Sequence, residues 1–348
     1  MFGVGTVFIV MSWSCISDNL LEMRGNKYCM SSECSEDDLP LVTIITPTYN
    51  SIPQYLKEAI ESVLEQTYPK IEYIITDDGS SVFHEELIHE LLRVGNRGNI
   101  TWKIIRHDEN VGTVKNMNGA IRESHGEYIF SLAHDDVYYD ERVIEEWVAE
   151  FQRTGALVIT GLRECWDLRK NAPTEILPTI EERRYLIEKK PRELNLILHR
   201  YNFISGASTA YSKGCMNKYR LFDEQYNLLE DYPSYLKLTY CGEVIHFWER
   251  ETIKYREVGI TSNINKTRGN LQLDKDFITL RIQKMKEERG LTKLIFAIDY
   301  ILGSIRVKAI GAIFKTNSYN RKRAQILYIP EYLAKNLLKI IENIHIWK

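Results

Sequence analysis

The sequence lacks the cysteine patterns that mark zinc sites and disulfide frameworks. Its six cysteines show no CxxC spacing, and half of them lie in the first 34 residues. Such isolated thiols are typical of proteins from reducing compartments, where they pack as small core residues. We therefore expect a cytoplasmic protein without structural zinc.

Long apolar runs are also missing. The N-terminal stretch MFGVGTVFIVMSW is apolar over only about a dozen residues, with no basic segment before it, so it matches neither a spanning helix nor a standard signal peptide. Met23 and Met30 precede the first convincing strand. We expect residues 1–38 to be an extension that is disordered or results from a start codon set too far upstream.

A glycine-rich phosphate loop is absent near the first strand. This absence disfavours a dinucleotide-dependent oxidoreductase and a nucleotidyltransferase. The rest of the composition is that of an ordinary globular protein, with 44% hydrophobic residues, 27% charged residues and a net charge of −3. We expect no nucleic-acid partner.

Strands and helices alternate from Pro40 onward. LVTIIT at 41–46 and IEYIIT at 71–76 are short β-branched runs, typical of strands buried on both faces of a parallel sheet. Apolar residues at helical spacing between them predict a βαβ unit. Further helices near 84–94, 113–124 and 143–153 and strands at 102–107, 128–133 and 156–160 extend the pattern. The sequence thus predicts a doubly wound α/β domain.

The chain after residue 160 is less regular. Helices are predicted over 183–200 and 228–240, separated by the small-residue segment FISGASTAYS. We divide the chain into the extension 1–38, an α/β domain over 39–265 and a basic helical region over 266–348. Residues 301–348 carry a net charge of +7. The segment 294–348 either contacts an anionic membrane peripherally or packs on the α/β domain, and the sequence favours neither.

Four polar clusters follow predicted structural elements. They are PTYN at 47–50, DDGSS at 77–81, HDD at 134–136, and LLEDYP at 228–233. The first three end strands of the predicted sheet, where α/β folds bind ligands. Hard oxygen ligands such as Asp135 and Asp136 suit Mg²⁺ or Mn²⁺, with His134 a secondary candidate. Asp231 is either a helix-capping acid or a general base, with Glu230 beside it.

The order LVTIITPTYN, IEYIITDDGSS, NVGTVKNMNGAI, GEYIFSLAHDD and LLEDYP resembles glycosyltransferase family 2, the inverting enzymes with the GT-A fold. The resemblance covers about residues 39–262. It implies a mixed, mainly parallel sheet flanked by helices, with a C-terminal helical extension. It also implies transfer of a sugar from a nucleoside-diphosphate donor, with a uracil-type base expected, to a saccharide or lipid-linked acceptor in surface polysaccharide assembly.

The resemblance implies a role for each matching residue. The segment Pro47, Thr48, Tyr49 and Asn50 would line the donor site, with Asp78 reading the base edge. Lys115 and Arg256 would neighbour the diphosphate, Asp135 and Asp136 would hold the metal, and Asp231 would act as catalytic base.

Two positions depart from the family pattern. Ala133 stands where many members carry Asp, and Lys115 replaces the usual Arg, which keeps the charge but loses the bidentate fork. A non-catalytic nucleotide-sugar-binding subunit and a nucleotidyltransferase remain alternatives. We expect a peripheral association with the inner face of the cell membrane if the tail binds lipid.

Overall fold

The computed structural model describes residues 38–167, 172–199, 201–256 and 268–287, together with 297 and 301. The chain divides into two compact units, Met1–Leu39 and Pro40–Lys348, and the fold described below belongs to the second. Residues 1–37 of the predicted extension, and nearly all of the basic segment 294–348, lie outside the described residues.

The first half of the fold alternates strands and helices as predicted. β1 is buried along almost its whole length, as expected of a central parallel strand. α2 begins at Pro53, where a missing N–H costs nothing. The elements in order are β1 (Val42–Thr48), α2 (Pro53–Leu64), β2 (Ile71–Asp77), α3 (Glu85–Gly95), β3 (Ile100–Arg106), α4 (Thr113–Arg122) and β4 (Tyr128–Ser131).

The second half contains strands that the sequence analysis did not predict. Its elements are β5 (Val137–Tyr138), α5 (Val143–Thr154), β6 (Val158–Asp167), β7 (Ala172–Leu177), α6 (Ile180–Glu188), α7 (Pro191–Leu198), the 3₁₀ turn η2 (Gly206–Ser208), β8 (Thr209–Ser212), α8 (Lys213–Tyr219), α9 (Asp231–Tyr240), β9 (Ile245–Arg256) and α10 (Arg268–Glu287). The single helix predicted over 183–200 is wrong. Pro191 divides it, because proline cannot continue a helix but can begin one.

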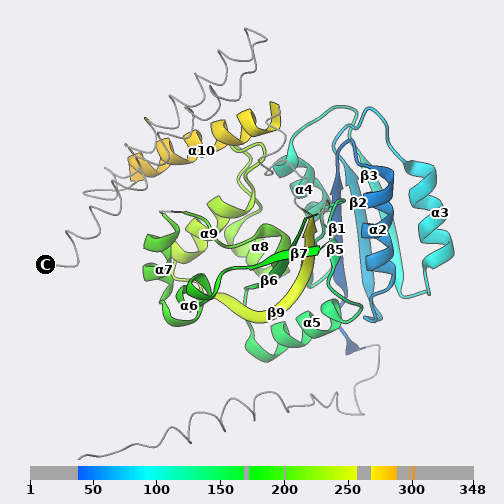
Figure 1. The fold of residues 1–348 in the computed structure, drawn as a ribbon, viewed down its shortest axis with the longest axis horizontal. Coiled ribbons are helices and arrows are strands. Elements are labelled where there is room, and N and C mark those ends of the chain that lie inside the picture. The colour runs from blue at the N-terminus through cyan, green and yellow to red at the C-terminus, as the bar shows by residue number, and fades with distance from the viewer. Residues whose placement is uncertain are drawn as a thin grey trace, which may run out of the picture. The chain divides into compact units, whose positions relative to one another are not determined.

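Within the described residues, nine strands form one mixed sheet, ordered β3-β2-β1-β4-β8-β6-β9-β5 with β7 beside β6. β1 pairs in parallel with β2 and β4, and β8 is antiparallel to β4. In Figure 1, β1–β3 with α2 and α3 lie on the right of the view, and α6, α7 and α9 lie on the left. The strand order reverses at β1, so the loops after β1 and β4 flank a topological switch point.

Helix α10 packs on the core built by the earlier elements. Leu280 is only 2% exposed and belongs to a cluster with residues of α4, α7 and α9. The ring of Phe277 lies 6.1 Å from that of Tyr232 on α9, and Figure 1 shows the two helices near one another. Helix α10 therefore packs on residues of the preceding domain.

Candidate functional site

The loops after β1 and β2 are fastened to each other by buried hydrogen bonds. Asp77 accepts from the hydroxyl of Thr48 at 2.9 Å, and from the backbone N–H and hydroxyl of Ser80 at 2.9 and 2.5 Å. Asn50 donates its backbone N–H to Ser80 Oγ at 2.7 Å, and its side-chain oxygen accepts from Ser81. The predicted motifs PTYN and DDGSS therefore form one braced unit.

Two backbone positions in this unit need unusual dihedral angles. Asn50 has a φ of 46°, a conformation that Asn tolerates better than most residues. Gly79 has a φ of 68°, and a Cβ there would overlap the backbone of Glu109 and Asn110. Only glycine fits at 79, so the DG sequence is required by the close approach of the 107–112 loop.

Asp78 connects the second motif with the third. Its carboxylate accepts from the backbone N–H of Val111 at 2.7 Å, and from that of Gly112 at 3.1 and 3.2 Å. Gly112 is the residue before α4, so this carboxylate stabilises the positive end of that helix. Burial raises the pKa of Asp78, although these two amides oppose the rise. The side chain that we predicted to read the base thus also fixes the start of α4.

Two predicted donor-binding side chains lie in the open beside this braced unit. The Tyr49 ring is 46% exposed and can stack on a flat partner. Lys115 is exposed in the first turn of α4. Thr48, in contrast, is 2% exposed with its hydroxyl donated to Asp77, and Pro47 lies within β1. The donor contacts of all four residues remain predictions.

The acidic turn after β4 is held by Arg256, the last residue of β9. The Arg256 backbone N–H donates to Asp136 Oδ1 at 3.0 Å, and Nη1 donates to the carbonyl of Asp135 at 2.9 Å. Nη2 pairs with Glu58 of α2, and the guanidinium lies 4.8 Å from the ring centre of Tyr55. In this structure Arg256 positions the predicted metal ligands. Its contact with the diphosphate remains a prediction.

Asp136 carries an unsatisfied buried oxygen. The residue is 1% exposed, and its Oδ2 has no hydrogen-bond partner among the described residues. Burial raises the pKa of Asp136 well above its usual range, and the neighbouring Asp135 carboxylate adds to the effect. A buried carboxylate oxygen without a donor is a position where a cation would be stabilising.

His134, the secondary candidate, is tied back to β1. Its Nδ1 lies 3.3 Å from the carbonyl oxygen of Pro47. A carbonyl only accepts, so this contact places the imidazole proton on Nδ1 and leaves the Nε2 lone pair for another partner.

Glu230 and Asp231 begin α9. Asp231 Oδ2 accepts from the backbone N–H of Gly206 at 3.1 Å, which holds the carboxylate against the turn η2. Burial raises the pKa of Asp231, and raises that of Glu230 to about 8 with a further contribution from the Asp231 charge. Two adjacent carboxyls in one partly buried place do not both ionise easily, so the charge of each opposes ionisation of the other.

Arg163 on β6 lies between the two acidic pairs and was missed by the sequence analysis. Its Nη1 donates to Ser205 at 3.0 Å, next to the Gly206 amide that holds Asp231. Its guanidinium lies 4.5 Å from the ring centre of Tyr255, the neighbour of Arg256. The positive charge opposes the raised pKa of both Asp136 and Asp231.

The Nε of Arg163 is buried and has no hydrogen-bond partner in the part of the chain that the structure describes. A charged side chain within the apolar strand VITGLRECW was the available sequence signal. Most buried polar atoms have a hydrogen-bond partner, so this unpaired nitrogen makes Arg163 a candidate site residue.

The residues present fit a hard divalent cation. Across the described residues, no three His, Cys, Asp or Glu side chains gather as a metal cluster. Mg²⁺ and Mn²⁺ do not need one when substrate phosphates complete the coordination, since one or two carboxylates are then enough. Asp135 and the unsatisfied oxygen of Asp136 would supply these carboxylates.

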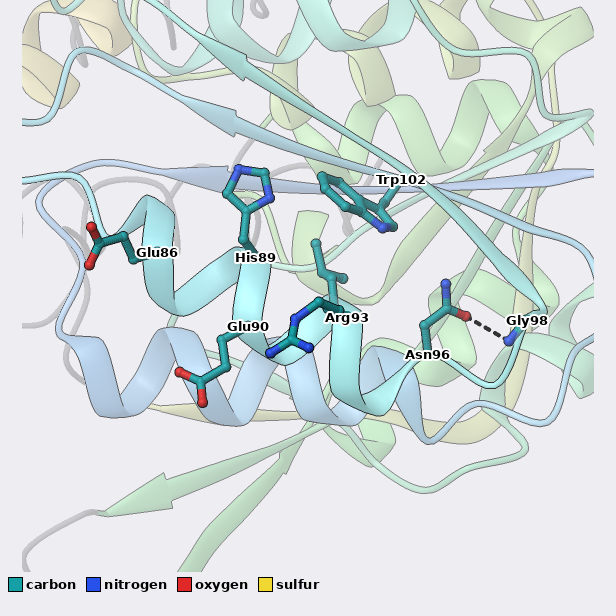
Figure 2. Close-up of a pocket in the computed structure, with 8 residues that line it drawn as sticks. Glu86, His89, Glu90, Arg93, Asn96, Gly98 and Trp102 are labelled. Atoms are coloured by element: carbon teal, nitrogen blue, oxygen red, sulfur yellow. Dashed lines mark hydrogen bonds between the residues drawn. The ribbon is translucent and has the colours of Figure 1, made fainter.

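A separate surface hollow of about 710 Å³ lies between α3 and the edge strand β3. Figure 2 shows its lining side chains, where the His89 and Trp102 rings pack edge to face at 5.1 Å. In the strand order, β3 is separated from β4 by β2 and β1. The hollow is therefore not part of the site at the switch point.

A mixed, mainly parallel sheet with acidic loops at its switch point is the arrangement predicted for the GT-A fold. The sequence model described as glycosyl transferase family 2 matches residues 43–219. This match covers half of the chain, and the chain belongs to that family. The predicted family and fold are confirmed.

Known proteins agree with this assignment. An uncharacterized glycosyltransferase of Rickettsia prowazekii is 28% identical over 72% of this chain and 74% of its own length. A Bacillus subtilis glycosyltransferase assigned provisionally to teichuronic acid biosynthesis is 29% identical over 35% of this chain and 46% of its own length. In two further relatives, both uncharacterized glycosyltransferases of Rickettsia, the aligned part covers 34% of the relative's own length.

Among solved structures, the Pyrobaculum calidifontis mannosyltransferase in complex with GDP-Man and Mn²⁺ has the same fold. It superposes with a TM-score of 0.51 at 13% identity, over 92% of this chain and 89% of its own. Within the described residues, no helix has both the length and the apolar composition needed to cross a membrane.

Proposed function

We propose that this protein is a metal-dependent inverting glycosyltransferase that moves a sugar from a nucleoside-diphosphate donor to a hydroxyl of a saccharide or lipid-linked acceptor. The observation that carries the proposal is that one partly buried arginine contacts the supports of both acidic pairs. Arg163 contacts Ser205 next to the amide that holds Asp231, and Tyr255 next to the arginine that holds Asp136. The same guanidinium charge acts on the Asp136 carboxylate and on the Asp231 carboxylate.

The donor would bind on the braced loops after β1 and β2. Tyr49 offers an exposed ring to the base, and Asp78 offers a carboxylate already oriented by two amides. The exposed ammonium of Lys115 and the start of α4 would face the diphosphate, because a helix N-terminus and a cation both attract phosphate. Because the Asp78 carboxylate is fixed before the donor arrives, little of its conformational entropy would be lost on binding.

The metal would be held by Asp136 and Asp135. Bound there, it would neutralise charge on the diphosphate as that group departs. Arg256 would keep both ligands in place through its contacts with the turn.

Asp231 would act as general base. It would accept the acceptor hydroxyl proton while the hydroxyl oxygen forms a bond to the anomeric carbon. The bond from that carbon to the diphosphate oxygen breaks, and the nucleoside diphosphate leaves with the electron pair. Because a raised pKa brings a carboxylate nearer to the operating pH, the burial of Asp231 suits this role. Glu230, with a pKa of about 8, would keep its own proton and leave Asp231 ionised.

The expected setting is surface polysaccharide assembly on the cytoplasmic side of the membrane. The provisional assignment of the Bacillus subtilis relative supports this class of product. The peripheral membrane contact predicted for 294–348 falls almost wholly outside the described residues. Liposome flotation of the full chain and of a chain ending at residue 293 tests it, and equal binding by both would remove the tail from the proposal.

A release assay tests the reaction. The protein is incubated with Mn²⁺ or Mg²⁺ and a panel of UDP-, GDP- and other nucleotide sugars, and free nucleoside diphosphate is measured with and without EDTA. We expect slow release from one donor, lost with EDTA and in Asp136→Ala. Release of pyrophosphate would instead indicate a nucleotidyltransferase. Tight donor binding without release, even with candidate acceptors, would favour a non-catalytic binding subunit.

A further inference from the structure

One buried carboxylate on α10 is bound to the loop that leads into the acidic pair. Asp276 is 3% exposed, and its Oδ2 accepts from the backbone N–H groups of Asn227, Leu228 and Leu229 at 2.9, 2.6 and 3.1 Å. We call residues 227–229 the 227–229 loop. Its last residue is followed directly by Glu230 and Asp231.

The same loop also contacts the donor side. The carbonyl of Asn227 accepts from the N–H of Val114 in α4 at 3.1 Å. A Cβ on Gly112 would lie 2.5 Å from Asn227 Nδ2, so the loop packs directly on the residue that Asp78 holds. A shift of the 227–229 loop would therefore move the acidic pair relative to the start of α4.

The hydrogen bonds of Asp276 are more than the docking of α10 requires. The helix is already anchored by Leu280 in the core and by Gln283, which binds Gln225 and Tyr226 at 2.7 Å each. Burying a carboxylate is costly unless several donors compensate it. Here three amides converge on one oxygen, and Gln272 donates to the other at 3.0 Å. Charge-assisted bonds of this kind fix a backbone more firmly than neutral ones.

We propose that Asp276 is a positioning residue for the transfer reaction, which holds the 227–229 loop so that Asp231 meets the acceptor at the correct distance from the donor. The inference rests on the proposed function of Asp231. It makes α10, which lies beyond the family match over 43–219, part of the catalytic unit.

The test compares three variants of the full chain. Asp276→Asn keeps the shape but removes the charge. Asp276→Glu keeps the charge on a longer side chain. Gln283→Ala removes a different contact between α10 and the same region and serves as control. Hydrogen exchange of the 227–229 amides, donor affinity by calorimetry and kcat of transfer are measured for each.

In Asp276→Asn we expect the three amides to exchange at least about tenfold faster, since the charged acceptor is lost. We expect kcat to fall by about 10–100-fold, because small misplacements of catalytic groups have effects of this size. Donor affinity should change by less than about threefold, since Asp78 still holds the donor loop. Asp276→Glu should lose less kcat than Asp276→Asn, and Gln283→Ala should keep wild-type kcat.

Several results would overturn the inference. Unchanged exchange in Asp276→Asn would show that Asp276 does not fix the loop, and faster exchange with wild-type kcat would show that the loop position does not matter. An equal kcat loss in Gln283→Ala would reduce the effect to helix docking. If Asp276→Asn does not fold, wild-type kcat in Asp276→Glu with its displaced carboxylate would still contradict the inference. Absence of turnover in wild type would instead overturn the proposed function itself.

Discussion

The two halves of the site treat their carboxylates in opposite ways. On the donor side, Asp77 and Asp78 are surrounded by backbone and hydroxyl donors that satisfy them. On the other side, Asp136 has an oxygen without a partner in the described part of the chain, and Glu230 has a pKa raised to about 8. Carboxylates whose oxygens are all hydrogen-bonded hold loops in place, whereas those with an unpaired oxygen or a raised pKa are suited to bind a cation or move a proton. The difference separates residues that build the site from residues that would perform its chemistry.

Asp231→Asn tests the residues that would perform the chemistry, and we expect it to have the largest effect on kcat. We expect kcat to fall by about a thousandfold, since general base catalysis contributes about 10²–10⁴. Donor affinity by calorimetry should remain near wild type. Asp223→Asn, an exposed acid of the same segment, is the control. Weakened donor binding in Asp231→Asn would move this residue to the donor side.

Arg163→Ala tests the group between the two acidic pairs. We expect kcat to fall by about 10–100-fold, a typical loss for one electrostatic contact in a site. Without the positive charge, the pKa of Asp231 and that of Asp136 rise further, so the acid limb of the pH–kcat profile should move to higher pH. Arg163→Lys should restore the acid limb in part, and the exposed Arg142→Ala should change nothing. An unmoved pH profile would make Arg163 a purely structural residue.

Asp77→Asn tests the building side. The variant should unfold at lower urea concentration, with a free energy of unfolding reduced by about 1–3 kcal/mol, because three buried donors lose a charged acceptor. Donor affinity should weaken while the pH dependence of kcat stays the same. The exposed Asp108→Asn is the matched control. A changed pH profile would show that the two halves are not separable in this way.

Glu230→Gln should produce a smaller, pH-dependent change in thermal stability. Folding raises the Glu230 pKa from 4.5 to about 8, so its contribution to stability is complete below pH 4.5 and is lost as the pH rises through 8. Gln does not titrate. The Tm of the variant minus that of wild type should therefore increase by a few degrees between about pH 5 and pH 8.5. A constant difference across this range would contradict the raised pKa.

Local patterns predicted the first half of the fold well. The β-branched runs at 41–46 and 71–76 and the polar residues after them are short-range signals, and the structure places both at the sheet edge expected of a βαβ unit. The predicted positions of Asp78 and Asp136 required only that strand ends meet, whereas Asp231 was predicted at the start of a helix, where it lies. Donor, metal and acceptor roles for these residues stay predictions.

The second half depended on contacts that no local pattern carries. β9 is a mixed polar and apolar strand that pairs with β5 and, through an irregular register, with β6. Arg163 and Asp276 are single charged residues whose partners lie 42 and 47–49 positions away. The positions of these two side chains are set by tertiary contacts, which the local sequence pattern does not reveal.

The register of β9 against β6 has a consequence for the exchange of segments between relatives. Tyr255 stands opposite Cys165, and Arg256 stands opposite Trp166. Neighbouring strand residues point to opposite faces, so a shift by one position would exchange the places of Tyr255 and Arg256. A chimera joined one residue out of step after α9 would remove the support of Asp136 and the partner of Arg163 together. Segments exchanged between relatives must therefore keep the number of residues from α9 to the end of β9.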